Sequence, residues 1–341
     1  MTVSPSSQAG RNRRRAFRPA SLLSTFLVVA LSTGMLSLTA CTKTKASANA
    51  DDSSRIKVIT TVFASYDFTR QIAGPYADVR MLVPPGSEIH SFEPTPQDIL
   101  DIEGCDLFIY VGGESDAWLN DLLASIDTSN VRILKLVDCV ETMLEDKSVL
   151  VDSDSLKGDA READTGEADE HVWTSIENAK AITIAISSNL MSLDRKHTTA
   201  FDENAQSYLQ QLDELDTLFR NTVEAGDRTT LIFGDRFPFL YLATEYGLQC
   251  YAAFPGCSSA TEPSARTVAS LIDIVNEKQI PVVFYIELSN HGLADVIAQE
   301  TGAQALMLHS CHNISAQDFA KGETYISLMK NNAENLKVAL S

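Results

Sequence analysis

Short apolar runs rich in β-branched residues alternate with segments of helical spacing along most of this chain. The runs 56–62 and 79–83 are predicted strands, and 64–73 between them is a predicted helix. This alternation favours a parallel sheet with helices on both faces. The pattern resumes after residue 226, where strands are predicted at 229–234, 248–254, 281–286 and 305–308. We therefore predict an α/β fold with two lobes, each a parallel sheet flanked by helices.

One long segment interrupts the alternation. Residues 198–224 place Tyr208, Leu212 and Leu215 at helical spacing, and Gly226 ends the predicted helix. A helix of this length spans about 40 Å, so we expect a rigid connection between the lobes. A helix that pairs with a partner chain in a coiled coil is the alternative. The predicted domains are an N-terminal lobe at 55–196, the connecting helix at 197–225 and a C-terminal lobe at 226–341.

The amino terminus has the pattern of an export signal. Five arginines precede an apolar run, which ends in Leu38-Thr-Ala-Cys41. This ending resembles a bacterial lipobox, in which the cysteine is lipidated and becomes the first residue. We predict a signal peptide at 1–40, lipid attachment at Cys41 and a polar tether at 41–54, which would hold the protein outside the cytoplasm on the cell membrane. A single transmembrane anchor is the alternative.

The charge of the chain restricts its partners. The formal net charge is −19 at pH 7, and residues 1–40 carry five arginines and no acidic residue, so the chain from Cys41 onward has a charge of −24. Such a surface repels phosphate backbones and argues against nucleic acid as a partner. Residues 151–170 are polar and strongly acidic, with no apolar periodicity. This loop is either a solvated run or a weak collector of cations.

The cysteines lack the pattern of a structural zinc knuckle. Once Cys41 is assigned to the lipid, five remain, and no two of them form a CxxC pair. Cys250 and Cys257 flank a short segment and can close a small disulfide loop in an oxidising compartment. One thiol is left over in any pairing.

Two histidines of the predicted N-terminal lobe lie at loop-to-helix junctions. His90 precedes a helix that Pro96 opens and Thr95 caps, and His171 precedes the helix predicted from about 176, with Ser175 as its cap. An isolated histidine in such a turn is more often a surface or packing residue. Because both lie on stiff turns of one lobe, we predict that their imidazoles share a metal site.

Acidic and imidazole side chains also follow the predicted strands of the C-terminal lobe. They are Asp235, Glu287, His309 and His312. For any one of them, surface solvation or helix capping is the simpler interpretation. Ligand sites in parallel sheets lie beyond the carboxyl ends of the strands, so the shared location favours a site that faces the first lobe.

Three sequence motifs carry a resemblance to a known family. They are Leu82-Val-Pro-Pro-Gly86, His90-Ser-Phe-Glu-Pro-Thr-Pro96 and Asp169-Glu-His-Val-Trp-Thr-Ser175. With them, the chain after the tether resembles the zinc/manganese substrate-binding lipoproteins of bacterial ABC importers. The resemblance implies two lobes joined by a rigid helix and one metal held by two residues from each lobe. It also implies delivery of the metal to a membrane permease rather than catalysis.

The resemblance also implies a set of metal ligands. The family's first two ligands correspond to His90 and His171, and we assign the other two to Asp235 and His309, with Glu287 and His312 as rivals. The proline that is familiar in the second motif is replaced here by Glu170. Three imidazoles and one carboxylate suit Zn²⁺, and Mn²⁺ is the alternative metal.

Two other classes of function remain open from the sequence. A metal-dependent hydrolase is one, although the chain has neither HExxH nor a nucleophile elbow, and we expect no enzyme. A surface adhesin lipoprotein with a structural metal is the other. For the importer receptor we expect a monomer.

Overall fold

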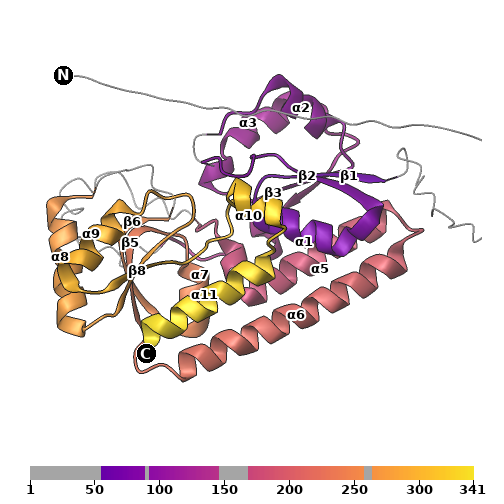
Figure 1. Ribbon diagram of the computed structural model, residues 1–341. Coiled ribbons are helices and arrows are strands. Elements are labelled where there is room, and N and C mark those ends of the chain that lie inside the picture. Colours follow the sequence, from indigo (N-terminus) through magenta and orange to yellow (C-terminus); the bar gives the residue numbers. More distant parts are fainter. Residues whose placement is uncertain (1–54, 89–91, 146–167, 257–262) are drawn as a thin grey trace, which may run out of the picture. The chain divides into compact units, whose positions relative to one another are not determined.

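A computed structural model describes residues 55–88, 92–145, 168–256 and 263–341, which Figure 1 draws in colour. These residues form two four-stranded sheets, one from each half of the chain. Every strand pair in both sheets is parallel. The strand orders are β2-β1-β3-β4 and β6-β5-β7-β8, so the same topology occurs twice. The predicted fold of two parallel-sheet lobes is confirmed.

The first sheet is made of short strands with a buried centre. Its strands are β1 (Ile56–Thr60), β2 (Ala77–Met81), β3 (Leu107–Tyr110) and β4 (Arg132–Lys135). All four residues of the central strand β3 are buried, whereas no residue of the edge strand β4 is. A central strand of a parallel sheet is covered on both faces, which explains its continuous run of apolar residues. The helices of this part are α1 (Phe63–Ala73), α2 (Pro96–Glu103) and α3 (Trp118–Ser125).

The second sheet contains the longest strand. Its strands are β5 (Thr230–Phe237), β6 (Gln249–Pro255), β7 (Val282–Tyr285) and β8 (Gln304–Met307), and its helices are α7 (Leu240–Tyr246), α8 (Ala265–Lys278) and α9 (Gly292–Thr301). Gly234 lies where α9 crosses β5, and a Cβ there would be 2.6 Å from the Cα of Ala294. Only glycine permits this close approach.

The predicted connecting helix is confirmed as α6 (Thr198–Glu224). It packs against α1, against α5 (Ile176–Leu193) and against the last helix, α11 (Tyr325–Leu340), and Figure 1 shows it running alongside α5 and α11. One face of α6 is buried, as its helical spacing predicts. The buried residues of that face are Phe201, Ala205, Tyr208, Leu212, Leu215 and Phe219.

The last helix, α11, hydrogen-bonds to two residues within the range 55–196, Asp67 and Trp173. The backbone N–H of Tyr325 donates to the Asp67 carboxylate of α1 at 2.8 Å. The Tyr325 hydroxyl donates to the carbonyl oxygen of Trp173, also at 2.8 Å. The residues of α11 lie within the range 226–341 that the sequence analysis assigned to the C-terminal lobe, and the long-range hydrogen bonds to α1 and Trp173 could not be predicted from local pattern.

Local signals at helix starts are confirmed. Thr95 accepts a hydrogen bond from the backbone of Asp98 and forms a capping box at the start of α2, with Pro96 in the first turn. Ser175 accepts from the backbone N–H of Asn178 and caps α5. The sequence did not predict the short helix α10 (Ala316–Lys321).

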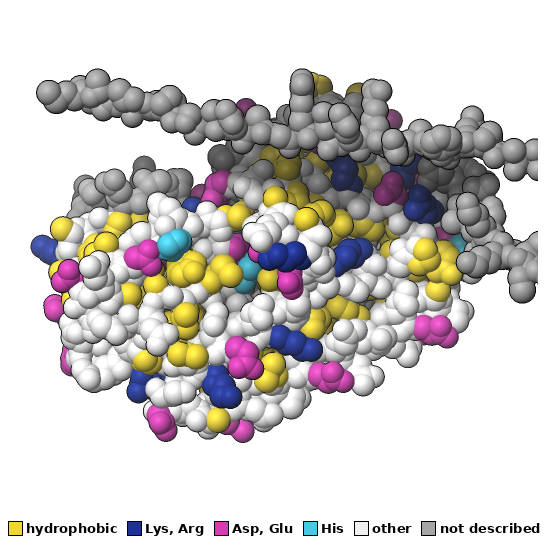
Figure 2. Space-filling model, in the orientation of Figure 1, with side chains coloured by type: hydrophobic (Ala, Val, Ile, Leu, Met, Phe, Trp, Pro, Cys, Tyr) yellow, Lys and Arg dark blue, Asp and Glu magenta, His cyan; other side chains and the backbone are white. Residues whose placement is uncertain are grey.

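Several predicted segments lie outside the described residues. They are the signal peptide at 1–40, Cys41, the tether and all of the acidic loop except 168–170. Among the residues that are described, no helix is long and apolar enough to cross a membrane. On the face drawn in Figure 2, acidic and basic side chains are interspersed.

Candidate metal centre

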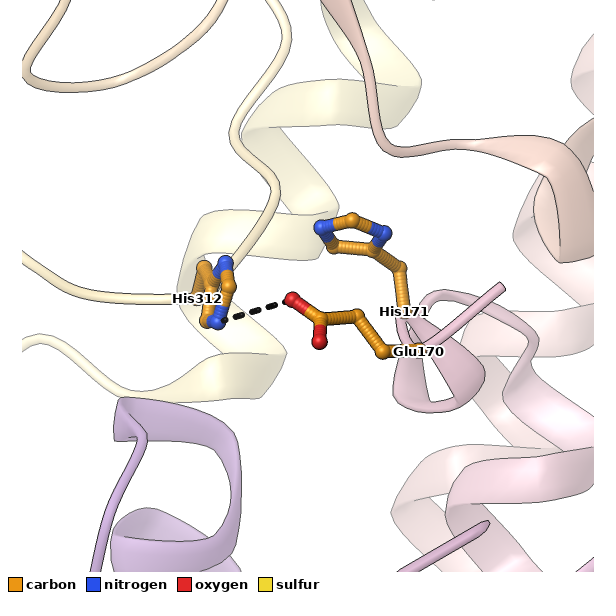
Figure 3. Close-up of side chains that lie close together, drawn as sticks. All are labelled: Glu170, His171 and His312. Carbon is orange, nitrogen blue, oxygen red and sulfur yellow. Dashed lines mark ion pairs between the residues drawn. The ribbon is translucent and has the colours of Figure 1, made fainter. Parts of the chain in front are cut away.

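Three buried side chains bring metal-binding atoms together. Glu170, His171 and His312 each place one such atom within 4.8 Å of the others. All three are at least nine-tenths buried, and the Nε2 atom of His312 lies 4.0 Å from Oε1 of Glu170 (Figure 3). The ring centroids of the two histidines are 5.2 Å apart. Nitrogen and oxygen donors at this spacing, shielded from water, suit a small divalent cation.

His171 is held by its own turn. It precedes a 3₁₀ turn at Val172–Thr174, and its backbone N–H and its Nδ1 both contact Oδ1 of Asp169, at 2.8 and 3.1 Å. An Nδ1–H that donates to Asp169 leaves Nε2 free to bind a metal. Burial opposes protonation of His171, but the carboxylates of Asp169, Glu170 and Glu145 outweigh it and raise the pKa of His171 above its usual range.

His312 is presented by the turn that follows β8. Cys311 in this turn has a positive φ of 60°. The Glu287 carboxylate accepts hydrogen bonds from the backbone N–H groups of Ser310, at 2.7 Å, and of His312, at 3.3 Å. The indole N–H of Trp173 donates to the carbonyl oxygen of Ser310 at 2.8 Å. The Trp173 bond ties the turn of His312 to the turn of His171.

The turn of His312 also supports the start of α1. The backbone N–H groups of Phe63 and Ala64 donate to the carbonyl oxygens of His312, at 2.9 Å, and Cys311, at 3.2 Å. The α1 N-cap, Val62, makes no side-chain capping bond, so these carbonyls satisfy N–H groups that would otherwise lack acceptors. His312 is thereby fixed to the first half of the protein.

The loop that leads to His90 is fastened to the same turn. The side-chain amide of Asn313 donates to the carbonyl oxygens of Pro84, at 3.0 Å, and Ser87, at 2.7 Å. Glu88 lines one pocket together with His171 and His312. His90 itself lies outside the described residues.

Comparisons with known proteins identify the family. The model of the family "Zinc-uptake complex component A periplasmic" (ZnuA) matches residues 58–339. The chain belongs to the ZnuA family. Its members are solute-binding receptors rather than enzymes, so the expectation of a non-enzyme is confirmed.

Individual relatives agree with this assignment. The high-affinity zinc uptake system protein ZnuA of Bacillus subtilis is 30% identical over 309 residues, which cover 89% of this chain and 94% of that protein. The zinc-binding lipoprotein AdcA of Streptococcus pneumoniae is 29% identical over 288 residues, covering 83% of this chain and 55% of that protein. This chain therefore spans about half the length of AdcA.

Solved structures share the fold. The Zn(II)-bound ZnuA-like domain of Streptococcus pneumoniae AdcA has 28% identity and a TM-score of 0.68, with 84% of this chain and 99% of that chain covered. The laminin-binding protein Lmb of Streptococcus agalactiae, described as having adhesin and metal transporting activity, has 25% identity and a TM-score of 0.70, covering 84% of this chain and all of that chain.

In this member of the ZnuA family, Asp235 is not part of the buried group of Glu170, His171 and His312. We predicted that the first strand of the second sheet ends at Gly234, but β5 continues to Phe237, with a register shift between Phe233 and Arg236. The Asp235 carboxylate accepts from its neighbour's backbone N–H, at 2.8 Å, and from that of Ile286, at 3.2 Å. Asp235 therefore joins β5 to the end of β7 rather than facing His171.

His309 is also outside the group, and the structure favours its rival His312. The Nδ1 atom of His309 accepts a hydrogen bond from the backbone of Cys311 at 2.9 Å. The side chain of Asn332 on α11 bonds to the backbone of His309 at both N–H and carbonyl. The other rival, Glu287, uses both carboxylate oxygens on the turn of His312, although it lines the same pocket.

The member of the buried group that the sequence analysis did not list as a candidate ligand is Glu170. Its signal was present, because Glu170 replaces the proline that is familiar at this position in the family. The predicted disulfide stays a prediction: Cys250 is a free, buried thiol in the structure, and Cys257 lies outside the described residues. The residue before Cys257, Gly256, lies against the His171 ring, since a Cβ at Gly256 would be 3.1 Å from Cε1 of His171.

Proposed function

We propose that this protein is an extracytoplasmic receptor that captures Zn²⁺ and delivers it to the permease of an ABC importer. The observation that carries the proposal is the buried group of Glu170, His171 and His312. Two imidazoles and a carboxylate at a buried site are ligands that zinc prefers, whereas manganese prefers more oxygen atoms and a higher coordination number. The names of two relatives, a zinc uptake system protein of Bacillus and a zinc-binding lipoprotein of Streptococcus, support the same cargo.

We infer that His90 completes the ligand set with His171 and His312. The support comes from the chain on its amino-terminal side: Asn313 fastens Ser87 beside the turn of His312, and Glu88 lines the pocket. His90 is the second residue after Glu88, so the two Cα atoms are at most about 7 Å apart along an extended chain. We do not include Asp235 and His309, which the sequence suggested, in this proposed ligand set.

The site is pre-organised for cargo before it binds. Trp173 and Phe63 donate hydrogen bonds to the turn of His312, and the Glu287 carboxylate accepts one from it. Asp169 orients His171. Ligands that are already positioned lose little conformational entropy on binding, which favours high affinity.

We further propose that a lipid on Cys41 anchors the mature protein, as a monomer, to the outer face of the cell membrane. We also propose that the domains are an N-terminal lobe at 55–196, a connecting helix at 197–225 and a C-terminal lobe at 226–341. The lipid anchor is supported by the basic and apolar leader, by the Leu-Thr-Ala-Cys ending and by the name of the relative AdcA, a zinc-binding lipoprotein. An adhesin role is the second candidate, because the similar structure of Lmb is described as that of a bifunctional adhesin.

A metal titration tests the receptor function. We would titrate the mature chain, from Cys41 onward, with Zn²⁺ and with Mn²⁺ by calorimetry. We expect one Zn²⁺ per chain and displacement of Mn²⁺. His171→Ala and His312→Ala should each lower zinc affinity at least tenfold, because each removes a ligand.

The matched control is His291→Ala. His291 is exposed, pairs with Asp295 at 2.8 Å and is not among the residues that line the pocket, so its loss should leave zinc affinity unchanged. A mature chain that binds no zinc at micromolar concentration would refute the receptor function. Equal losses in the three variants would refute the site.

A further inference from the structure

Glu170 has the properties of a metal-binding carboxylate held ready for an ion. The side chain is 1% exposed, and its Oε2 accepts a hydrogen bond from the backbone N–H of Ser115 at 2.9 Å. Its other oxygen, Oε1, accepts no hydrogen bond from any residue that the structure describes. A buried carboxylate oxygen without a donor is costly, and such an atom calls for a specific explanation.

Oε1 of Glu170, the oxygen that accepts no hydrogen bond, points toward the two histidines. Oε1 lies 4.0 Å from Nε2 of His312, and the group as a whole fits within 4.8 Å (Figure 3). In a tetrahedral zinc site with bonds of about 2.0–2.2 Å, donor atoms lie about 3.3–3.6 Å apart. Small side-chain rotations, of the order of 1 Å at the donor atoms, therefore place all three on one ion.

The other candidate carboxylates are already committed. Asp235 accepts two backbone N–H groups and lines a different pocket from that of His171 and His312. Both oxygens of Glu287 are used by Ser310, and one of them also by His312. Either carboxylate would have to give up hydrogen bonds in order to bind a metal, and those of Glu287 hold the turn of His312.

The surrounding backbone is shaped around Glu170. A Cβ at Gly113 would lie 2.2 Å from both Cβ and Oε2 of Glu170. Gly113 therefore leaves the space that the Glu170 side chain fills, and it belongs to the loop after β3, at the carboxyl end of the sheet.

From these observations we propose that Glu170 is a direct ligand of the captured metal and supplies the carboxylate of the site. This inference rests on the proposed function and deepens it. The second sheet then contributes no carboxylate from β5, and its half of the chain supplies His312 alone among the described ligands. The carboxylate comes instead from the residue next to His171, on the same turn.

The test compares two isosteric substitutions, Glu170→Gln and Asp235→Asn, in the mature chain. Glu170→Gln keeps an oxygen for Ser115 but replaces the anionic ligand, so zinc affinity should fall at least tenfold. Asp235→Asn should bind zinc within threefold of the unchanged protein. A loss below tenfold for Glu170→Gln would overturn the proposal.

A spectroscopic measurement separates a ligand from a structural residue. Co²⁺ bound in place of zinc has visible absorption bands that depend on its direct ligands. We expect Glu170→Gln to change these bands and Asp235→Asn to leave them as they are. Unchanged bands in Glu170→Gln would overturn the ligand role even if affinity falls.

A second variant, Glu170→Asp, keeps the charge but withdraws the carboxylate by one methylene. It should also bind zinc at least tenfold more weakly; affinity within threefold would overturn the proposal. If the unchanged protein binds zinc and His171→Ala and His312→Ala lose it, the receptor function stands whatever the Glu170 variants show. If the unchanged protein binds no zinc, both proposals fail.

Discussion

Removing the hydroxyl group should destabilise the protein at one of two buried tyrosines, Tyr325, but not at the other, Tyr208. Tyr325 and Tyr208 are at most 2% exposed, and both rings pack against Phe68. The Tyr325 hydroxyl donates to the carbonyl oxygen of Trp173 at 2.8 Å. The Tyr208 hydroxyl has no hydrogen-bond partner among the described residues. Phenylalanine removes one oxygen at each site and leaves the ring contacts in place.

The expected magnitudes follow from the hydrogen bonds. Tyr325→Phe leaves the buried carbonyl of Trp173 without this donor, which should lower the free energy of unfolding by about 1–3 kcal/mol. Tyr208→Phe removes a buried polar group that is not compensated, so it should leave that free energy unchanged or raise it by about 1–2 kcal/mol. Burial raises the pKa of the Tyr208 hydroxyl well above its usual range, in keeping with an unfavourable environment for that group.

Urea-induced unfolding of the metal-free protein, followed by tryptophan fluorescence and circular dichroism, measures both effects. The midpoint should fall for Tyr325→Phe and stay or rise for Tyr208→Phe, with an unchanged dependence on urea concentration. Equal destabilisation by the two variants would refute the reasoning. It would mean that packing around the rings, rather than the hydrogen bond to Trp173, determines the cost.

Three further predictions concern packing, capping and reactivity. Gly234→Ala puts a Cβ 2.6 Å from the backbone of α9 and should lower the free energy of unfolding, measured by urea titration, by about 1–3 kcal/mol. The control Gly292→Ala, whose nearest contact is at 3.6 Å, should change that free energy by less than about 0.5 kcal/mol. Ser175→Ala removes the cap of α5 and should lower the free energy of unfolding by about 1 kcal/mol, with a smaller loss for Ser175→Asn. Burial raises the pKa of Cys105 to about 12 and that of Cys139 to about 11, so both thiols stay protonated at pH 8. Peptide mass spectrometry should find them labelled by a thiol reagent only after denaturation. Rapid labelling of the native protein would contradict this prediction.

Interactions between residues close in sequence explain why the helices and the turn of His171 could be predicted. The bounds of α6 follow from one apolar face, and the start of α2 follows from Thr95, Pro96 and Asp98, which lie within four residues of one another. His171 was likewise placed correctly before a helix that Ser175 caps. Each of these features depends on neighbours along the chain, which a sequence displays directly.

The ligand set of the second half could not be decided in this way. His309 and His312 follow the same strand, and their choice depends on the turn at Cys311, where a non-glycine residue has positive φ. Asp235 was predicted to follow the strand, but β5 continues past Gly234, and the pairing with β6 that extends it is not visible in a local pattern.

The sequence by itself determined an α/β chain with two parallel sheets, a long helix between them and His171 on a stiff turn. The tertiary structure decided which side chains meet. His312 reaches His171 because Trp173 bonds to Ser310 and the start of α1 bonds to the carbonyl of His312, contacts between residues more than 130 positions apart in the chain. Periodicity and capping act within a few residues, whereas a metal site requires the folded backbone to bring distant residues together.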